Sequence, residues 1–157
     1  MQDPVYIAGD GTNLWVANFN AGTVAKLSGA TGALEAITPL PFTSSNPNAV
    51  AVDDGHAWMV SYYGGQLTEL SRSTGAVLSV ISIPGPPCPC DEPFPLTSIA
   101  DDGTHVWVAQ SDPPYSGTLV EVDAVTESDW VPWRLHTLEE DGAWQRAVEP
   151  RRGTPLN

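Results

Sequence analysis

Two cysteines and two carboxylates form one compact group of side chains that could bind a metal or undergo redox chemistry. Cys88 and Cys90 flank a single proline and are followed by Asp91 and Glu92. Zinc sites usually take four ligands and commonly use Cys-x-x-Cys spacing, and the sequence has no second cysteine pair. A disulfide between these cysteines would close a small, strained ring. The pattern favours a proline-stiffened loop over residues 84–93, and we predict no cofactor and no metal site.

Paired acidic residues precede glycines at Asp53-Asp54-Gly55 and Asp101-Asp102-Gly103. Calcium-binding loops need oxygen ligands at fixed, alternating positions, and these segments lack that spacing. Hairpin turns explain them better, because glycine tolerates the positive φ that tight turns require. The three histidines, His56, His105 and His136, come with no readable nucleophile and acid partner. We therefore predict no catalytic residue.

The acidic turns belong to a unit that occurs three times. Each unit starts with a proline before an apolar run, continues through a turn and reaches a tryptophan. The aligned turns are Asp10-Gly11, Asp54-Gly55 and Asp102-Gly103, and the aligned tryptophans are Trp15, Trp58 and Trp107. A second turn, Thr31-Gly32 in the first unit and Thr74-Gly75 in the second, follows later. Internal repeats with the spacing of these tryptophans indicate a repeat architecture.

Each unit reads as four short strands, placed in the first unit at roughly residues 5–8, 14–18, 23–27 and 33–38. Four-stranded sheets that repeat with this period are typical of β-propeller blades. We predict an all-β fold with three four-stranded antiparallel sheets, forming an incomplete propeller. The expected blades cover residues 4–46, 47–94 (with the insertion 84–93) and 95–133. Residues 134–157 form an irregular or short helical tail, because residues 137–140 resemble a capping box that would start a helix over about 138–148.

The repeated proline, Asp-Gly, tryptophan and Thr-Gly positions resemble the NHL/YVTN-type propeller repeats, including those of streptogramin lyase-like proteins. The resemblance implies that the first strand of each blade lines a central channel, with ligands at one mouth of it. It also implies an extracytoplasmic location. The lyase branch combines His and Glu with a divalent metal. The segments after the tryptophans, Trp15-Val16-Ala17-Asn18, Trp58-Met59-Val60-Ser61 and Trp107-Val108-Ala109-Gln110, carry no Glu. No catalytic role is carried over.

The loops that follow the second strand of each unit are the predicted binding surface. They are rich in amide and aromatic side chains, which suit a sugar or a peptide, and equivalent loops should gather on one face of the ring. The candidate residues are Asn18, Asn20, Tyr62, Tyr63, Gln110, Asp112 and Tyr115. Ordinary polar loops are the alternative interpretation.

Charge restricts the class of partner. The chain has 6 basic and 19 acidic residues, a formal net charge of −13, and such a field repels phosphate backbones. We therefore predict no nucleic-acid binding. Apolar stretches are too short for a membrane span.

Three blades are fewer than the four to eight of known propellers, so the end blades should expose packing faces. We expect the chain to be a fragment of a larger ring, and the alternatives are self-association through the end blades or shielding of one end by the tail. The predicted function is a non-catalytic binding or scaffold propeller for a protein, small-molecule or carbohydrate ligand. The alternative is part of a lyase- or hydrolase-like enzyme whose catalytic residues lie on other blades.

Overall fold

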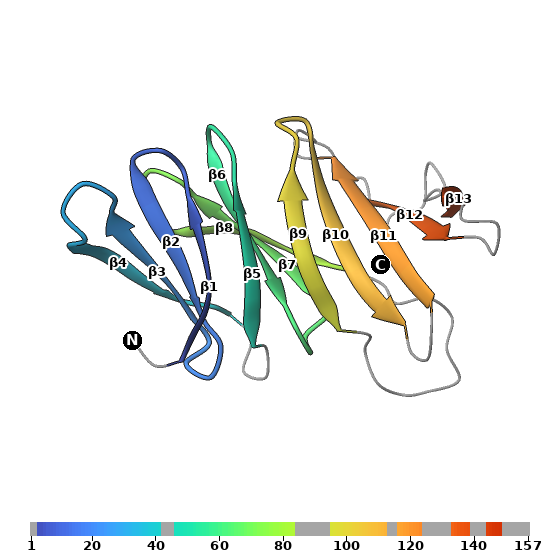
Figure 1. The fold of residues 1–157 in the computed structure, drawn as a ribbon, viewed down its shortest axis with the longest axis horizontal. Helices are drawn as coiled ribbons and strands as arrows, with labels where there is room; N and C mark the ends of the chain where they lie inside the picture. Colours follow the sequence, from blue (N-terminus) through green and yellow to red (C-terminus); the bar gives the residue numbers. More distant parts are fainter. Residues whose placement is uncertain are drawn as a thin grey trace, which may run out of the picture.

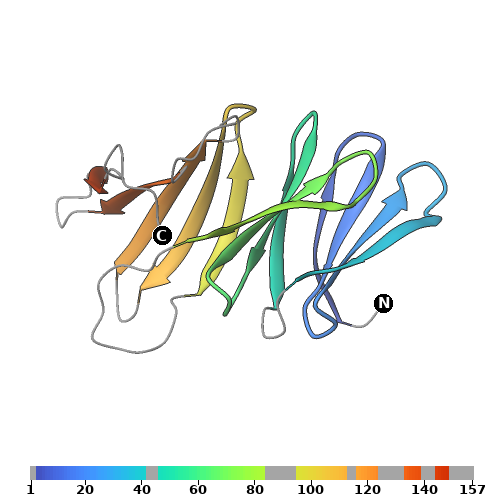
Figure 2. The ribbon, with the colours of Figure 1, turned by 180° about the vertical axis from the view of Figure 1, so that it is seen from behind.

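The computed structural model describes residues 3–41, 46–83, 95–112, 116–123, 133–138 and 144–148. Within these residues the chain forms antiparallel strands and no helix, as predicted for an all-β fold. The strands make three sheets that stand side by side in chain order (Figure 1). Figure 2 shows the same arrangement from behind, with the outer strands β4 and β8 inclined to the inner ones.

Each sheet is built from consecutive strands in the predicted order. The first sheet contains β1 (Pro4–Gly9), β2 (Asn13–Asn18), β3 (Thr23–Ser28) and β4 (Leu34–Pro39). The second contains β5 (Pro47–Val52), β6 (His56–Ser61), β7 (Gln66–Ser71) and β8 (Val77–Ser82). The third contains β9 (Leu96–Asp101), β10 (His105–Asp112), β11 (Ser116–Asp123), β12 (Trp133–Leu138) and β13 (Trp144–Val148).

The third sheet corrects the prediction for the C-terminal segment. Its fourth strand, β12, lies at Trp133–Leu138, mostly inside the expected tail, and Trp144–Val148 forms a fifth strand where a short helix was expected. A capping-box pattern is only a local preference. The backbone N–H and C=O groups along the edge of β12 need partners, and pairing with β13 supplies them.

Glycines set the tight turns between the outer strands. Gly32 has a φ of 69° and Gly75 a φ of 75°, a left-handed conformation in which a side chain would be strained. Their amides donate to the carbonyl oxygens of Ser28 and Ser71 at 2.8 and 2.7 Å. The Thr-Gly turns therefore close the β3–β4 and β7–β8 hairpins.

The hydrophobic core lies between the sheets. Trp15, which is 1% exposed, packs with Val24 of the first sheet against Val50 and Met59 of the second. Trp58, which is 2% exposed, packs in the equivalent way against the third sheet. The hydrophobic cluster around Trp58, between the second and third sheets, also includes Val60, Leu67, Leu96, Val106 and Val108. Trp15 and Trp58 are thus inter-sheet packing residues, whereas Trp107 of the third sheet is only partly buried.

Polar contacts surround these apolar junctions. Lys26 Nζ donates to the carbonyl oxygen of Ser73 at 2.9 Å, and Thr38 Oγ1 donates to that of Gly75 at 2.7 Å. Between the second and third sheets, Asn48 Nδ2 donates to the carbonyl oxygen of Thr97 at 3.0 Å. Each sheet is therefore fixed to the next by both apolar packing and hydrogen bonds.

We expect Trp58→Ala to lower the free energy of unfolding by about 3–5 kcal/mol, because it leaves a large cavity between two sheets. Trp58→Phe, which keeps an aromatic ring but loses the indole N–H, should cost less. Urea unfolding followed by circular dichroism measures both. Equal stability of Trp58→Ala and the parent chain would contradict this role.

Candidate functional site

One side-chain hydrogen bond recurs at the first hairpin turn of every sheet. The indole Nε1–H of Trp15 donates to Asp10 Oδ2 at 3.1 Å. Trp58 donates to Asp53 Oδ2 at 2.9 Å, and Trp107 donates to Asp102 Oδ2 at 3.1 Å. In each sheet the aspartate lies five residues before the tryptophan. A buried indole needs a partner for its N–H, and this aspartate provides it.

The second oxygen of each aspartate holds the turn itself. Asp10 Oδ1 accepts from the backbone amides of Thr12 and Asn13 at 2.8 and 2.6 Å. Asp53 Oδ1 accepts from Gly55 and His56, both at 2.6 Å. Asp102 Oδ1 accepts from Thr104 and His105 at 2.9 and 2.7 Å. These are Asx-type turns, in which a short carboxylate replaces a backbone acceptor.

This geometry corrects the sequence alignment of the second turn. Asp53, and not Asp54, is the equivalent of Asp10 and Asp102. Gly11 and Gly103 both have a φ of 84°, whereas Gly55 lies one position later and has no positive φ. The sequence comparison aligned Asp54-Gly55 with the other two turns because Asp-Gly is a strong local hairpin signal. The spacing from aspartate to tryptophan is the signal that identifies the correct residue.

These hydrogen bonds shift the acidities of the aspartates. Burial would raise the pKa of Asp10, but hydrogen bonds from Asn13, Arg72, Thr12 and Trp15 outweigh burial and hold that pKa well below its usual range. Asp53 shows the same balance. Burial opposes ionisation there, but hydrogen bonds from Trp58, Gly55 and His56 lower the pKa.

The carboxylate of Asp102 is affected chiefly by hydrogen bonds. The backbone amide of His105, the Trp107 indole and the amide of Thr104 lower the pKa of Asp102. All three turn aspartates are thereby stabilised as anions.

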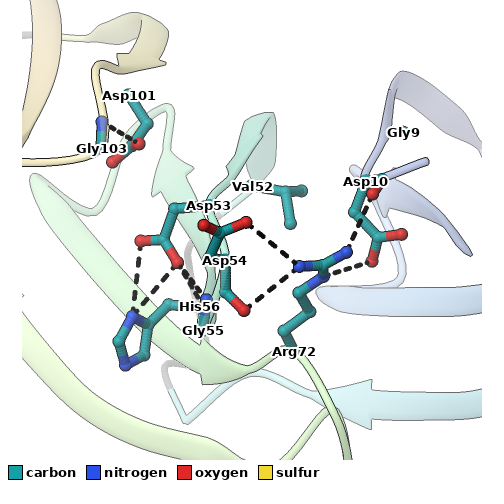
Figure 3. A pocket seen from close by; sticks show the side chains of 10 residues that line it. All are labelled: Gly9, Asp10, Val52, Asp53, Asp54, Gly55, His56, Arg72, Asp101 and Gly103. Atoms are coloured by element: carbon teal, nitrogen blue, oxygen red, sulfur yellow. Dashed lines mark hydrogen bonds and ion pairs between the residues drawn. The ribbon is translucent and has the colours of Figure 1, made fainter. Parts of the chain in front are cut away.

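The three turns surround a hollow of about 470 Å³ (Figure 3). Its lining comes from all three sheets: Gly9, Asp10, Val52, Asp53, Asp54, Gly55, His56, Arg72, Asp101 and Gly103. Arg72, from the β7–β8 turn of the second sheet, reaches across one side of it. Its Nε lies 3.1 Å from Asp10 Oδ2, and its Nη2 donates to the Asp10 carbonyl oxygen at 2.9 Å. Its Nη1 donates to the carbonyl oxygen of Asp54 at 3.1 Å.

Asp101 faces the hollow from the third sheet. Gly103 N donates to its Oδ1 at 2.7 Å. Burial raises the pKa of Asp101, and the nearby carboxylates of Asp53 and Asp102 add to this. The hollow therefore attracts cations and repels anions. Most of its carboxylate oxygens are already bound to turn amides, indoles or Arg72, so its first role is structural.

Two histidines link carboxylates beside these turns. His56 Nδ1 lies 3.3 Å from Asp53 Oδ1, and His56 Nε2 lies 3.3 Å from Glu69 Oε1. His105 repeats the arrangement, with Nε2 3.6 Å from Glu121 Oε1. The same positions in the first sheet hold Asn13 and Lys26. His136 lies in β12.

The predicted loop residues include one aromatic cluster. Tyr62 and Tyr63 meet edge to face with ring centroids 4.7 Å apart, and Phe19 of the first sheet lies 6.1 Å from Tyr62. Tyr63 is 53% exposed. Asn20, which is also exposed, donates from Nδ2 to Asp3 Oδ2. The structure thus brings two of the predicted loops together. We name Phe19, Asn20, Tyr62 and Tyr63 the aromatic loop face.

Two predicted binding residues are buried instead. Asn18 is 0% exposed and donates from Nδ2 to Thr23 Oγ1 at 3.1 Å, and Gln110 is 3% exposed. Each is three residues after its tryptophan and two after a buried valine, so strand alternation points it into the sheet packing. Asp112 ends β10. Tyr115, Cys88 and Cys90 lie outside the described residues.

Within the described ranges, no group of three or more His, Cys, Asp or Glu side chains could hold a metal ion. The same ranges contain no helix long and apolar enough to cross a membrane.

Comparison with solved structures identifies the architecture. Hydrazine synthase of Kuenenia stuttgartiensis matches 96% of the chain with a TM-score of 0.61 and 14% sequence identity. The structures of U3-55K and of the RRP9 WD40 repeats each match 93% of it, with a TM-score of 0.57 and 10% identity. The fold is a β-propeller. The three sheets are its blades.

These similarities establish the fold and not the NHL/YVTN subtype. No family model matches the sequence, and the search of curated proteins finds no match. The chain spans 50% of the hydrazine synthase chain, 52% of U3-55K and 51% of the RRP9 chain.

Stability should fall in acid because of the turn aspartates. Their folded-state pKa values are depressed, so their contribution is present above the unfolded pKa, about 3.9, and is lost as the pH falls through the folded values. Asp101 acts in the opposite sense, because a raised folded pKa gives stability that is lost as the pH rises.

We expect Asp53→Asn to lower stability at pH 7 by about 1–2 kcal/mol and to flatten the decline in stability below about pH 4. Asp54→Asn is the matched control, because Asp54 is exposed and bonds no tryptophan. Urea unfolding across the acid range measures both slopes. If Asp53→Asn kept the slope of the parent chain, the turn aspartate would not be responsible.

Proposed function

We propose that the chain is a non-catalytic binding module that contacts a protein or carbohydrate ligand through its aromatic loop face. The observation that carries the proposal is the pairing of Tyr62 with Tyr63. Tyr63 is 53% exposed although its ring is supported edge-on by its neighbour. Tyrosines in this setting supply apolar area and a hydroxyl group at low entropic cost, which suits both sugar and peptide ligands.

The backbone beneath these rings is fixed at both ends. Tyr62 N donates to the Asn46 carbonyl oxygen at 2.8 Å, and the Tyr62 carbonyl oxygen accepts from Leu96 N at 3.2 Å. Asn46 Nδ2 donates in turn to the carbonyl oxygen of Phe19 at 3.4 Å. These contacts join the aromatic loops to all three sheets. A surface held in place before binding loses less entropy when the ligand arrives.

The fold itself is compatible with several functions. Solved propellers similar to this chain include WD40-repeat proteins and proteins named as enzymes. No arrangement of side chains among the described residues specifically favours the lyase- or hydrolase-like alternative. The acidic hollow at the opposite ends of the strands is occupied mainly by the protein's own donors. The aromatic loop face is therefore the better-supported contact surface.

Tyr63→Ala should weaken binding of any captured ligand at least about tenfold, since exposed tyrosines often dominate contact energies. The parent chain is first screened against an oligosaccharide array and a random peptide library. Each binder is then measured by calorimetry with Tyr63→Ala and with the control Leu78→Ala, which removes an apolar side chain of similar exposure, 54%, from β8. Retention of every ligand by Tyr63→Ala would refute this contact surface.

A further inference from the structure

Three polar side chains of the second sheet face the first sheet at the junction between the two. Thr68 pairs with Met59, which packs in one cluster with Trp15 of the first sheet. Ser61 lies two residues after Met59 in β6, and Gln66 lies two residues before its strand neighbour in β7. Strand side chains alternate between faces, so all three are on the face that meets the first sheet. We name Ser61, Gln66 and Thr68 the junction polar group.

Each member of the junction polar group has a buried oxygen atom without a hydrogen-bonding partner among the described residues. These atoms are Ser61 Oγ, Gln66 Oε1 and Thr68 Oγ1. Ser61 and Thr68 are both 0% exposed, and Gln66 is half-buried. Six buried side-chain oxygens in the described part of the chain lack a partner, and three of them belong to this one group. A buried polar atom without a partner costs free energy, so their concentration here needs a physical explanation.

The third sheet shows that the fold does not require a hydroxyl group at the position of Thr68. Val108 pairs with Val120 in the third sheet as Met59 pairs with Thr68 in the second. Val120 is 0% exposed and packs in the apolar cluster between the second and third sheets. A valine, which has the shape of a threonine, is therefore compatible with this place in a blade. The hydroxyl group of Thr68 is a departure from the repeat.

The first sheet contributes smaller side chains to this junction than the second sheet contributes to the next one. Ala17 pairs with Val24, and both belong to the cluster between the first and second sheets. Their equivalents in the second sheet are Val60 and Leu67, which pair in the same way and pack against the third sheet. Each residue of the first pair is smaller than its equivalent. This difference favours a site for a small molecule beside the junction polar group.

The atoms of the junction polar group define the chemistry of a suitable ligand. The amide oxygen of Gln66 only accepts hydrogen bonds, whereas the hydroxyl groups of Ser61 and Thr68 both donate and accept. These three side chains do not bond to one another. A ligand that serves all of them must be small and neutral, and it must both donate and accept hydrogen bonds. Water meets these requirements, and a buried water typically bonds to about three polar groups of the protein.

We propose that one ordered water molecule binds between Ser61, Gln66 and Thr68 in the junction of the first and second sheets. Its hydrogen bonds join β6 to β7 at the base of the loop that carries Tyr63, because Ser61 ends β6 and Gln66 begins β7. The site lies between two sheets that pack together within the chain, and it does not depend on the ligand proposed for the aromatic loop face. The bound water is a structural component of this junction.

A high-resolution crystal structure of the parent chain tests the site directly. We expect one electron-density peak within hydrogen-bonding distance, about 2.5–3.2 Å, of all three oxygen atoms of the junction polar group. A junction in which no peak contacts all three, or in which the three side chains bond to one another instead, overturns the proposal. This measurement decides the question even where a variant of the chain does not fold.

Stability distinguishes a hydroxyl group that binds water from one that is merely buried. Thr68→Val keeps the shape of the side chain and removes the hydroxyl group. If that group bonds to water, the variant loses a hydrogen bond, and the unfolding equilibrium constant should rise about fivefold. Removal of an uncompensated hydroxyl group would instead lower the constant. Urea unfolding followed by circular dichroism gives the sign of the change, and an unchanged or lowered constant rejects the site.

Thr38→Val is the matched control, because the Thr38 hydroxyl group donates to a protein acceptor, the Gly75 carbonyl oxygen, at 2.7 Å. It removes one established hydrogen bond by the same chemical change. The control should raise the unfolding constant by a similar factor, and a Thr68→Val effect of the opposite sign contradicts a bound water.

A second variant, Ser61→Ala, tests whether one molecule is shared by the group. If Ser61 and Thr68 bond to the same water, the double variant should lose less stability than the two single variants predict together. Independent effects that simply add would show that the two hydroxyl groups have no common ligand.

Discussion

The hydrogen bond from each tryptophan indole to the aspartate five residues earlier links the local turn of a hairpin to the packing between sheets. At the local scale, the same carboxylate accepts the turn amides and closes the first hairpin, as Asp53 does for Gly55 and His56. At the larger scale, it satisfies the polar atom of a side chain that fills the space between two sheets. Without that acceptor, a buried indole N–H would carry a desolvation penalty. One residue therefore stabilises both the turn and the junction.

The repeat in the sequence was sufficient to predict the sheets because it records this shared constraint. Proline-led first strands, turn glycines and regularly placed tryptophans each correspond to a strand or turn that recurs in the structure. Within a sheet, contacts are mostly between neighbouring strands, so local sequence signals and period-two alternation describe them well.

The errors arose where a decision depended on distant residues. Asp54-Gly55 looked like the equivalent turn because its local chemistry is favourable, whereas the tryptophan partner selects Asp53. The C-terminal segment resembled a helix start, but pairing at the edge of β12 makes β13. Asn18 and Gln110 looked like loop ligands because they are polar and were placed where the loop after the second strand was expected to begin. Asn18 ends β2, but β10 continues past Gln110 to Asp112. Alternation from the buried Val16 and Val108 already indicated that both side chains are buried.

The same geometry separates the two ends of the strands into different surfaces. At the first turns, every sheet has an aspartate that accepts from its tryptophan, and two of these, Asp10 and Asp53, line the hollow. The packing requirement therefore accounts for part of its negative charge. At the loops after the second strands, no such requirement exists, and the aromatic side chains of Tyr62 and Tyr63 are not explained by the repeat. Tyr63 in particular remains exposed beside residues that the inter-sheet contacts hold in place. Repetition thus accounts for the residues that build the propeller, and the departure from repetition indicates where a ligand-specific surface has been added.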